Sequence, residues 1–400
     1  MSGATELLVT VAGKQVGLLA YEDYQYSFRY DAPSRLTPTT DLVSLTMPVR
    51  AASYDTQVLP PPFQMLLPEG DLLLQLRARF GKALDLDNDF NLLRLVGHNT
   101  IGRLGFRELD SAFAPAQPMP AIPALETLLR HPDARALLGE LIDIYGVRSG
   151  IGGMQPKALL ALGSQLTLTS GDVILKAAGS DFPQLPVNEY FCLQASRAAE
   201  IPTVACRLSD SCELLLVDRF DRRRGGQPLA FEEICALLQL GRHGKYSGSY
   251  EQIAEVIQQI PCQKTPTALE QFFRSVALAM TVRNGDAHLK NFGVTYESSD
   301  RVMWSPAYDL VTTTVYRIKD TPALELAGRK TWPGRPALEH FGLHACNLRR
   351  AAVRRSLEAV AGAVHDTVRK LRRFVRREPE FAALASRMIE QWRQGLEGLR

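Results

Sequence analysis

The stretch from residue 266 to residue 309 constrains the fold most, because a helical pattern leads directly into a short polar turn. Apolar side chains recur at the spacing of one buried helical face, and Pro266 lies near the first helical position. The apolar positions are Leu269, Phe272, Val276 and Met280. We therefore expect a helix that delivers the polar turn RNGDAHLKN, residues 283–291, to a fixed place in the fold.

Two short β-prone runs follow this turn. The runs FGVTY and VMW are separated by Ser298, Ser299 and Asp300, a pattern that predicts a β-hairpin. We expect Asp309 at the end of the second strand. Two carboxylates and a carboxamide would then converge at the ends of packed elements.

The chemistry of these three groups suits a divalent metal and a phosphate. Mg²⁺ prefers oxygen ligands and is usually held by one or two carboxylates plus substrate phosphates, so Asn291 and Asp309 could supply the oxygen pair. Asp286 could orient and deprotonate an attacking hydroxyl. Protein kinases separate their catalytic Asp and metal-binding Asn by five positions, as Asp286 and Asn291 are separated here. From this motif alone, a polar loop whose side chains only cap backbone groups remains an equal alternative.

Composition sets broad limits. A chain of 400 residues with 46% hydrophobic and 22% charged residues can form two or three globular domains, and a net charge of +3 selects no partner. Its six cysteines show no metal-ligand spacing, which is typical of reduced thiols in a cytoplasmic protein. We identify no signal-peptide pattern and no apolar run that approaches a membrane span, so we expect no membrane association.

Four regions follow one another along the chain. Residues 1–110 contain three β-prone runs, and a turn at Pro68 to Gly70 opens a helix. Residues 111–127 are rich in proline and nearly uncharged, which indicates a linker. Strand patterns dominate residues 128–225, and helical patterns dominate residues 226–400, including FEEICALLQL at 231–240.

A glycine-rich loop precedes a lysine-bearing strand. Gly150, Gly152 and Gly153 leave room for a closely approaching ligand, and their N–H groups could face phosphate oxygens. The runs KALLAL, QLTLT and VILKAA then predict three strands, the third carrying Lys176. Kinases place the lysine that contacts the α- and β-phosphates in this setting, and we favour that interpretation over a solvated edge lysine.

Three further features have two interpretations each. Glu189, in the first turn of a predicted helix, could favour the helix dipole or pair with Lys176. The strand end at Asp218 to Phe220 could hold adenine or simply end a strand. The helix pattern at residues 349–377 has a clear apolar stripe and ten Lys or Arg against two acids. For this basic face, solvation is favoured over nucleic-acid contact.

Together these motifs resemble the HipA family, the serine/threonine kinase toxins of bacterial toxin–antitoxin modules. The resemblance spans nearly the whole chain and rests on segments that occur in the family's order. These segments are LLPEG, NLLRLVGHNTIGRLGF, GIGGMQPK, VILK, VNEYFCLQ, VDRFDRR, GDAHLKNF and PAYDL. The resemblance implies an α+β protein. A small N-terminal α/β subdomain would be followed by a bilobal protein-kinase-like fold with a β-rich nucleotide lobe and a mainly helical C-terminal lobe.

The resemblance also implies roles for individual residues. Asp286 would be the catalytic base, and Lys290 would neutralise charge on the transferred phosphoryl group. Asn291 and Asp309 would hold Mg²⁺. The residues implied to contact ATP are Gly152, Gly153, Gln155, Lys157, Lys176, Asp218, Phe220 and His288. One departure stands out: where family members carry an autophosphorylated serine, this chain has Gly150, and the adjacent Ser149 could substitute for it.

The expected cofactors are therefore ATP and Mg²⁺. The resemblance further implies a helix-turn-helix antitoxin as partner, contact with DNA only through that antitoxin, and a protein substrate such as an aminoacyl-tRNA synthetase. A kinase of small molecules or lipids on a similar scaffold, or a co-repressor without catalysis, remain alternatives.

Overall fold

The computed structural model describes residues 6–81, 84–97, 100–109, 125–133, 136, 165–170, 172–179, 181–223 and 226–400. Most of the predicted linker at 111–127 lies outside these residues. The predictions for Ser149, Gly150, Gly152, Gly153, Gln155 and Lys157 and for the strand KALLAL also lie outside them.

The N-terminal part is built on an antiparallel five-stranded sheet with the order β4-β3-β2-β1-β5. Its strands are β1 (Glu6–Val11), β2 (Lys14–Glu22), β3 (Gln25–Tyr30), β4 (Tyr54–Thr56) and β5 (Leu104–Glu108). Its helices are α1 (Pro61–Gln64), α2 (Gly70–Phe80) and α3 (Asp89–Val96). Aromatic side chains from the sheet and the helices meet in one buried core, for example Phe28, Phe63 and Phe106. The three predicted strands and the helix after Pro68 to Gly70 are confirmed.

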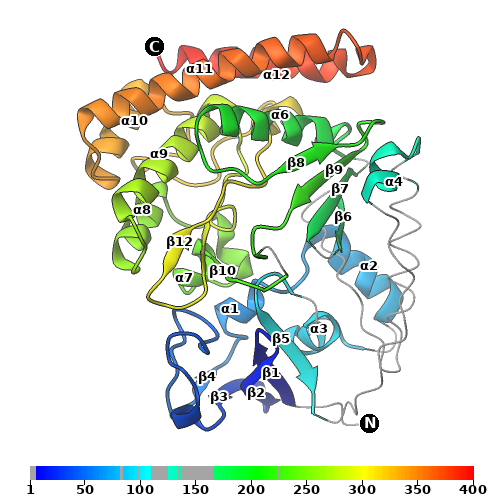
Figure 1. The fold of residues 1–400 in the computed structure, drawn as a ribbon, viewed down its shortest axis with the longest axis vertical. Coiled ribbons are helices and arrows are strands. Elements are labelled where there is room, and N and C mark those ends of the chain that lie inside the picture. Colours follow the sequence, from blue (N-terminus) through cyan, green and yellow to red (C-terminus); the bar gives the residue numbers. More distant parts are fainter. Residues whose placement is uncertain are drawn as a thin grey trace.

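A second, four-stranded sheet has the order β6-β7-β9-β8. Its strands are β6 (Gln165–Ser170), β7 (Val173–Ala178), β8 (Cys206–Leu208) and β9 (Leu214–Asp218). Helix α6 (Leu185–Ala198), with Pro186 in its first turn, packs against this sheet, and α4 (Leu125–Arg130) lies near its edge (Figure 1). Leu175 and Ala177 in β7 and Leu214, Leu215 and Leu216 in β9 are fully buried, as expected for central strands.

A third sheet, β10-β11-β12, corrects one prediction. Its strands are β10 (Ala230–Glu233), β11 (Gly293–Tyr296) and β12 (Val302–Trp304). The hairpin of β11 and β12 is confirmed, but residues 230–233, mostly predicted as helix, form a strand, and the helix α7 spans only Ile234–Leu237. Antiparallel pairing of Ala230 with Tyr296 and of Glu232 with Val294 explains the difference, because a partner strand overrides weak local helix propensity.

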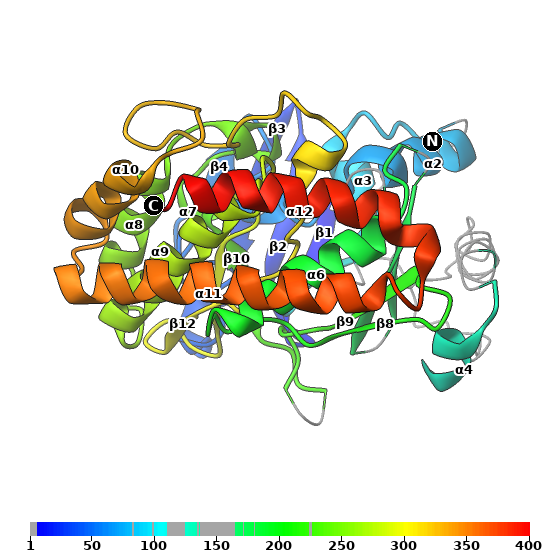
Figure 2. The same ribbon diagram turned by 90° about the horizontal axis from the view of Figure 1, so that it is seen from above.

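Helices make up the remainder. They are α8 (Tyr250–Gln259), α9 (Thr265–Thr281), α10 (Arg335–His340), α11 (Arg350–Phe374) and α12 (Ala382–Glu397). Short 3₁₀ turns occur at Pro33–Arg35, Arg242–Tyr246, Thr313–Val315 and Pro379–Phe381, and a π-turn at Phe341–Ala345. Figure 2 shows α11 and α12 side by side across the C-terminal end of the molecule. The predicted apolar stripe of α11 is confirmed by the burial of Val353, Leu357, Val360, Val364 and Leu371.

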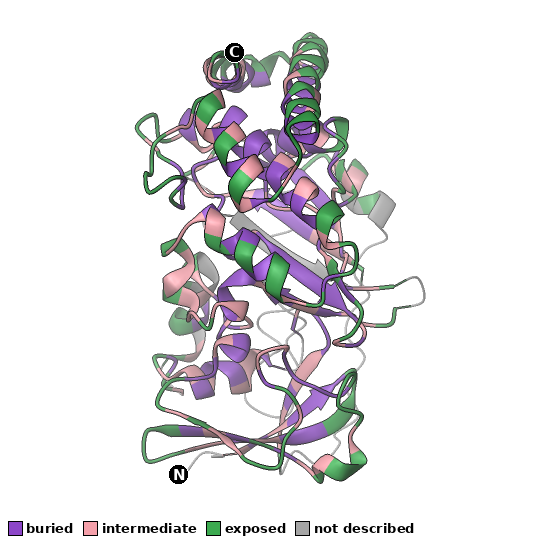
Figure 3. Cartoon of the chain, turned by 90° about the vertical axis from the view of Figure 1, so that its left-hand side faces the viewer, coloured by how far each residue is buried: buried purple, intermediate pink, exposed green. Residues whose placement is uncertain are grey.

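Burial follows this layered arrangement. Buried residues concentrate in the strands and on the inward faces of the helices, while exposed residues lie on the outer faces (Figure 3). The predicted fold class, an N-terminal α/β subdomain followed by a kinase-like bilobal part with a mainly helical end, is confirmed. Within the described ranges, no helix combines the length and apolar character needed to cross a membrane.

Candidate active site

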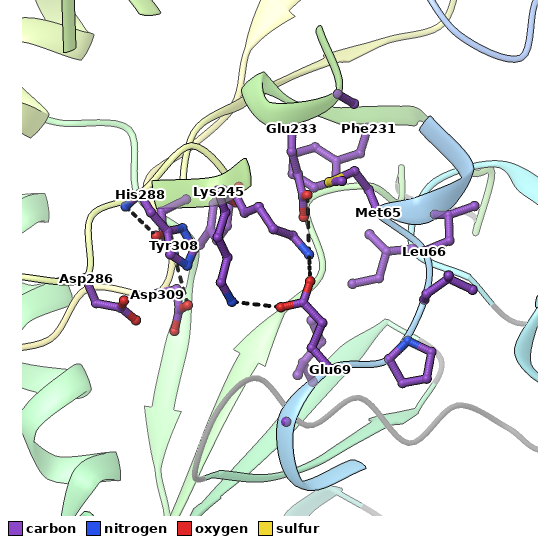
Figure 4. Close-up of a pocket in the computed structure, with 18 of the residues that line it drawn as sticks. Met65, Leu66, Glu69, Phe231, Glu233, Lys245, Asp286, His288, Tyr308 and Asp309 are labelled. Atoms are coloured by element: carbon purple, nitrogen blue, oxygen red, sulfur yellow. Dashed lines mark hydrogen bonds and ion pairs between the residues drawn. The ribbon is translucent and has the colours of Figure 1, made fainter. Parts of the chain in front are cut away.

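A cavity of about 640 Å³ opens where the N-terminal subdomain, the second sheet and the polar turn meet. Its lining includes Glu69 from the N-terminal part, Lys176 from β7, and Asp286 and Asp309 from the segment 266–309. Figure 4 shows the side chains of Glu69, Asp286 and Asp309 in this cavity. The fold thus brings together residues more than 200 positions apart.

Lys176 connects two carboxylates from different elements. Its Nζ donates to Oε1 of Glu189 at 2.6 Å and to Oδ1 of Asp309 at 3.0 Å. Lys176 is 5% exposed and Glu189 is fully buried, so neither is a solvated surface residue. Burial opposes the charge of Lys176, but Asp309 and Glu189 outweigh it and raise the pKa of the ammonium above its ordinary value. Of the two interpretations of Glu189, the structure therefore shows the ion pair with Lys176.

Asp309 and Asn291 face each other. Nδ2 of Asn291 donates to Oδ2 of Asp309 at 3.1 Å, while Oδ1 of Asn291 accepts from the backbone N–H of His288 at 2.9 Å. Burial would raise the pKa of Asp309, but Lys176 lowers it below its usual value, so the carboxylate is charged at neutral pH. The expectation that Asp309 ends the second strand is wrong: β12 ends at Trp304, and Asp309 lies in the following loop with φ of 54°.

Asp286 lies in the turn after α9, and its Oδ1 accepts the hydroxyl proton of Tyr246 at 2.8 Å. Its own N–H donates to Oδ1 of Asn284 at 3.0 Å, which fixes the start of the turn. Burial raises the pKa of Asp286 to about 6, the negative charge of Asp309 adds to the rise, and the Tyr246 hydrogen bond limits it. A carboxylate with this pKa can accept a proton at neutral pH more readily than an exposed one.

His288 is neutral and has an unused nitrogen. Burial lowers the pKa of His288 to about 4. Its Nδ1 is buried and has no hydrogen-bond partner among the residues that the structure describes. The ring lies edge-on to Tyr246, with the two centroids 5.1 Å apart. A buried nitrogen without a partner on the cavity wall is a group that a bound ligand could satisfy.

Lys290 points to carboxylates that sequence reasoning did not identify. Its Nζ lies 2.8 Å from Oε1 of Glu69 and 3.7 Å from Oε2 of Glu233, and Lys245 binds the other oxygen of Glu69 at 2.7 Å. Burial raises the pKa of Glu233 to about 7, and Lys290 opposes this rise. The run LLPEG contained the signal for Glu69, since it belongs to the motifs of the family resemblance; no pattern in the sequence marked Tyr246 or Glu233.

The predicted adenine contacts line the same cavity. The ring of Phe220 packs against Phe231 and Tyr308, at centroid distances of 5.0 and 5.3 Å, and those two rings also contact each other. The backbone N–H of Asp218 donates to the carbonyl of Ala205 at 2.8 Å, so a contact of Asp218 with adenine would need another of its groups.

The oxygen donors of the site suit a partly protein-bound metal rather than a closed metal site. No group of three or more His, Cys, Asp or Glu residues in the described part of the chain has the arrangement of a closed metal site. The two oxygen-bearing side chains Asn291 and Asp309, beside a lysine, fit Mg²⁺, which takes its remaining ligands from phosphates and water. The residues present therefore fit a Mg²⁺–nucleotide complex.

The lysine on a central strand, its glutamate on the next helix and the Asp–Asn pair opposite define a protein of the bilobal kinase-like class. Family comparison gives the narrower assignment. Residues 7–107 match the HipA N-terminal domain, and residues 149–368 match the HipA-like C-terminal domain. The chain belongs to the HipA family.

Individual proteins are also similar to this chain. Two Sinorhizobium fredii proteins, named "Putative kinase Y4mE" and "Putative kinase Y4dM", are each 27% identical to this chain over 293 and 298 residues. The alignments cover 68% of this chain in both cases and 69% and 67% of the relatives. The HipA chain of the Shewanella oneidensis HipA, HipB and operator DNA complex superposes with a TM-score of 0.71 over 97% of both chains, at 17% identity. At that identity the superposition supports the fold alone.

Proposed function

We propose that this protein is an ATP- and Mg²⁺-dependent serine/threonine protein kinase that acts as the toxin of a HipA-type toxin–antitoxin module. One observation carries the proposal: the strand amine of Lys176 lies 3.0 Å from Asp309, beside Asn291. A nucleotide in the cavity would then be contacted by the amine from one side and by oxygen ligands from the other. The names of the Sinorhizobium fredii relatives support kinase activity.

Asp286 is the base in the proposed reaction. A substrate hydroxyl that takes the place of the Tyr246 hydroxyl at Oδ1 of Asp286 gives up its proton to the carboxylate while its oxygen forms the new bond to the γ-phosphorus. The bond from that phosphorus to ADP breaks, and ADP leaves with the electron pair. Mg²⁺ held by Asn291 and Asp309 would offset charge on the phosphate oxygens.

The remaining residues bind and orient. Lys176, held by Glu189, contacts the phosphates, and the neutral His288 offers an unpaired nitrogen to the ligand. Asp218 and Phe220 border adenine, and the loop from Gly152 to Lys157, with Gly153 and Gln155, is proposed to cover the phosphates. Lys290, in the same turn as the base, is proposed to neutralise charge on the transferred phosphoryl group. Ser149 is proposed as the site of autophosphorylation.

The partners follow from the family. We propose a helix-turn-helix antitoxin that links the protein to DNA, and a translation component such as an aminoacyl-tRNA synthetase as substrate. The HipA chain that matches this fold was solved with HipB and operator DNA, which supports the antitoxin proposal. The proposed compartment is the cytoplasm. The proposed domains are an N-terminal subdomain at residues 1–110, a nucleotide-binding lobe at 128–225 and a helical catalytic lobe at 226–400, with a linker at 111–127 between the first two.

Phosphate transfer from γ-labelled ATP to proteins of a bacterial lysate tests the proposal. Wild-type protein should label itself or another protein in a Mg²⁺-dependent manner, and mass spectrometry should locate the phosphate on Ser or Thr. Asp286→Asn should abolish transfer while nucleotide affinity stays within about twofold, because the substitution removes the base and keeps the side-chain shape. Undiminished transfer by this variant would exclude Asp286 as the base; labelling of lipid or metabolite alone would favour a different kinase class.

A further inference from the structure

The N-terminal subdomain places one carboxylate inside the candidate active site. Oε1 of Glu69 lies 2.8 Å from Nζ of Lys290. Oε2 lies 2.7 Å from Nζ of Lys245, and Figure 4 shows Glu69 and Lys245. Each oxygen therefore holds a different lysine of the catalytic part. Glu69 and both lysines line the same cavity as Asp286.

The local backbone aims Glu69 away from its own helix. Leu67 is anchored in the N-terminal core, and Gly70 begins α2 with φ of 56°, a conformation that glycine adopts without strain. Glu69 is the residue that precedes α2, where a side chain commonly caps the helix, yet it makes no capping hydrogen bond. Its carboxylate is used across the cavity instead.

Electrostatics keep this contact charged. Burial would raise the pKa of Glu69, but Lys290 and Lys245 lower it to about 2. Lys290 is only 6% exposed, so its ammonium group depends on these carboxylates rather than on bulk solvent for its contacts. Loss of Glu69 would leave Lys290, among the described residues, with the Glu233 carboxylate 3.7 Å away.

Both lysines lie in segments that contain or contact Asp286. Lys290 follows Asp286 by four positions in the same turn, and Lys245 precedes Tyr246, whose hydroxyl donates to Asp286. A backbone hydrogen bond of 3.1 Å from Leu289 to the carbonyl of Lys245 ties the two segments together. Glu69 thus fixes the segments on two sides of the base.

We propose that Glu69 is a positioning residue for phosphoryl transfer, so that the N-terminal subdomain completes the active site. The inference rests on the proposed kinase function. Glu69 acts through Lys290 and Lys245, which hold the turn of Asp286 in place. Because small misplacements of reacting groups cost large factors in rate, loss of Glu69 should slow the chemical step more than it weakens ATP binding.

The test compares Glu69→Gln with Asp89→Asn in the full-length protein. Asp89 also joins the N-terminal subdomain to the 242–246 turn, through an ion pair of 2.8 Å with Arg242, but it contacts neither lysine. Asp89→Asn is therefore a matched control for a general weakening of the contact between the two parts. We expect Glu69→Gln to lower the maximal rate of phosphate transfer from labelled ATP about tenfold. ATP affinity by calorimetry should stay within about twofold, and Asp89→Asn should keep nearly the wild-type rate.

A wild-type rate in Glu69→Gln, or an equal loss in both variants, would overturn the inference. Hydrogen exchange measured by mass spectrometry provides a second readout that needs no activity. Peptides covering residues 284–291 should exchange faster in Glu69→Gln than in wild type or Asp89→Asn, and unchanged exchange would also refute the positioning role. If wild-type protein transferred no phosphate, the kinase proposal would fail, while the exchange comparison would still decide the role of Glu69.

Discussion

Removal of the Tyr246 hydroxyl should move the acidic limb of the pH profile to higher pH. In the proposed mechanism Asp286 must be unprotonated, and its pKa of about 6 means that kcat/KM falls as the pH drops below that value. The Tyr246 hydrogen bond favours the charged carboxylate and therefore lowers this pKa. Tyr246→Phe keeps the ring, which packs on His288, and removes only the donor.

The size of the shift follows from the environment of the bond. A hydrogen bond to a charged acceptor contributes about 1.5–3 kcal/mol, and the 44% exposure of Tyr246 discounts this to about 1 kcal/mol. At 1.36 kcal/mol per pH unit, the pKa of Asp286 should rise by about 0.7 unit. Activity at pH 6 should then fall about threefold relative to wild type, with little change at pH 8.

The assay is kcat/KM against pH for the acceptor protein that labelling identifies, because this parameter reports the free enzyme. Tyr54→Phe is the control, since it loses a phenolic hydrogen bond to the Pro48 carbonyl in the N-terminal subdomain. An unmoved acidic limb in Tyr246→Phe, or a shift to lower pH, would refute the assignment of the limb to Asp286.

Two further predictions concern stability. Lys176→Met should lower the free energy of unfolding by about 3 kcal/mol at pH 8, because buried Glu189 and Asp309 lose their cation. The loss should be smaller at pH 5, since the pKa values of Glu189 and Asp309 rise without the Lys176 charge and protonation then relieves them. Urea denaturation at both pH values measures this, and an equal loss would contradict it. Gly395→Ala should destabilise by at least about 2 kcal/mol, because a Cβ would lie 1.9 Å from the carbonyl oxygen of Thr281 where α12 packs on α9. Thermal unfolding measures this loss. The control is Gly362→Ala on the exposed side of α11, where a Cβ meets nothing within 4 Å, and it should be neutral or stabilising by up to about 1 kcal/mol.

Local periodicity determined much of the fold in advance. The spacing of Leu269, Phe272 and Val276 predicted α9, because burial of one face imposes a period on the sequence. The β-prone runs at the N-terminus predicted its first strands. Local periodicity did not predict the strand at residues 230–233. Their strand exists because β11 offers a partner, and a partner 60 residues away leaves no local periodic signal.

The sequence and the tertiary structure likewise determined different parts of the candidate site. Spacing within one turn related Asp286 to Asn291, and strand context singled out Lys176, so the sequence alone nominated these groups of the proposed reaction. Only the tertiary structure decided that Glu189 pairs with Lys176, that Tyr246 donates to Asp286, and that Glu69 reaches the cavity. These contacts depend on how separate elements pack against one another, and a one-dimensional pattern of burial does not encode the direction of a long side chain.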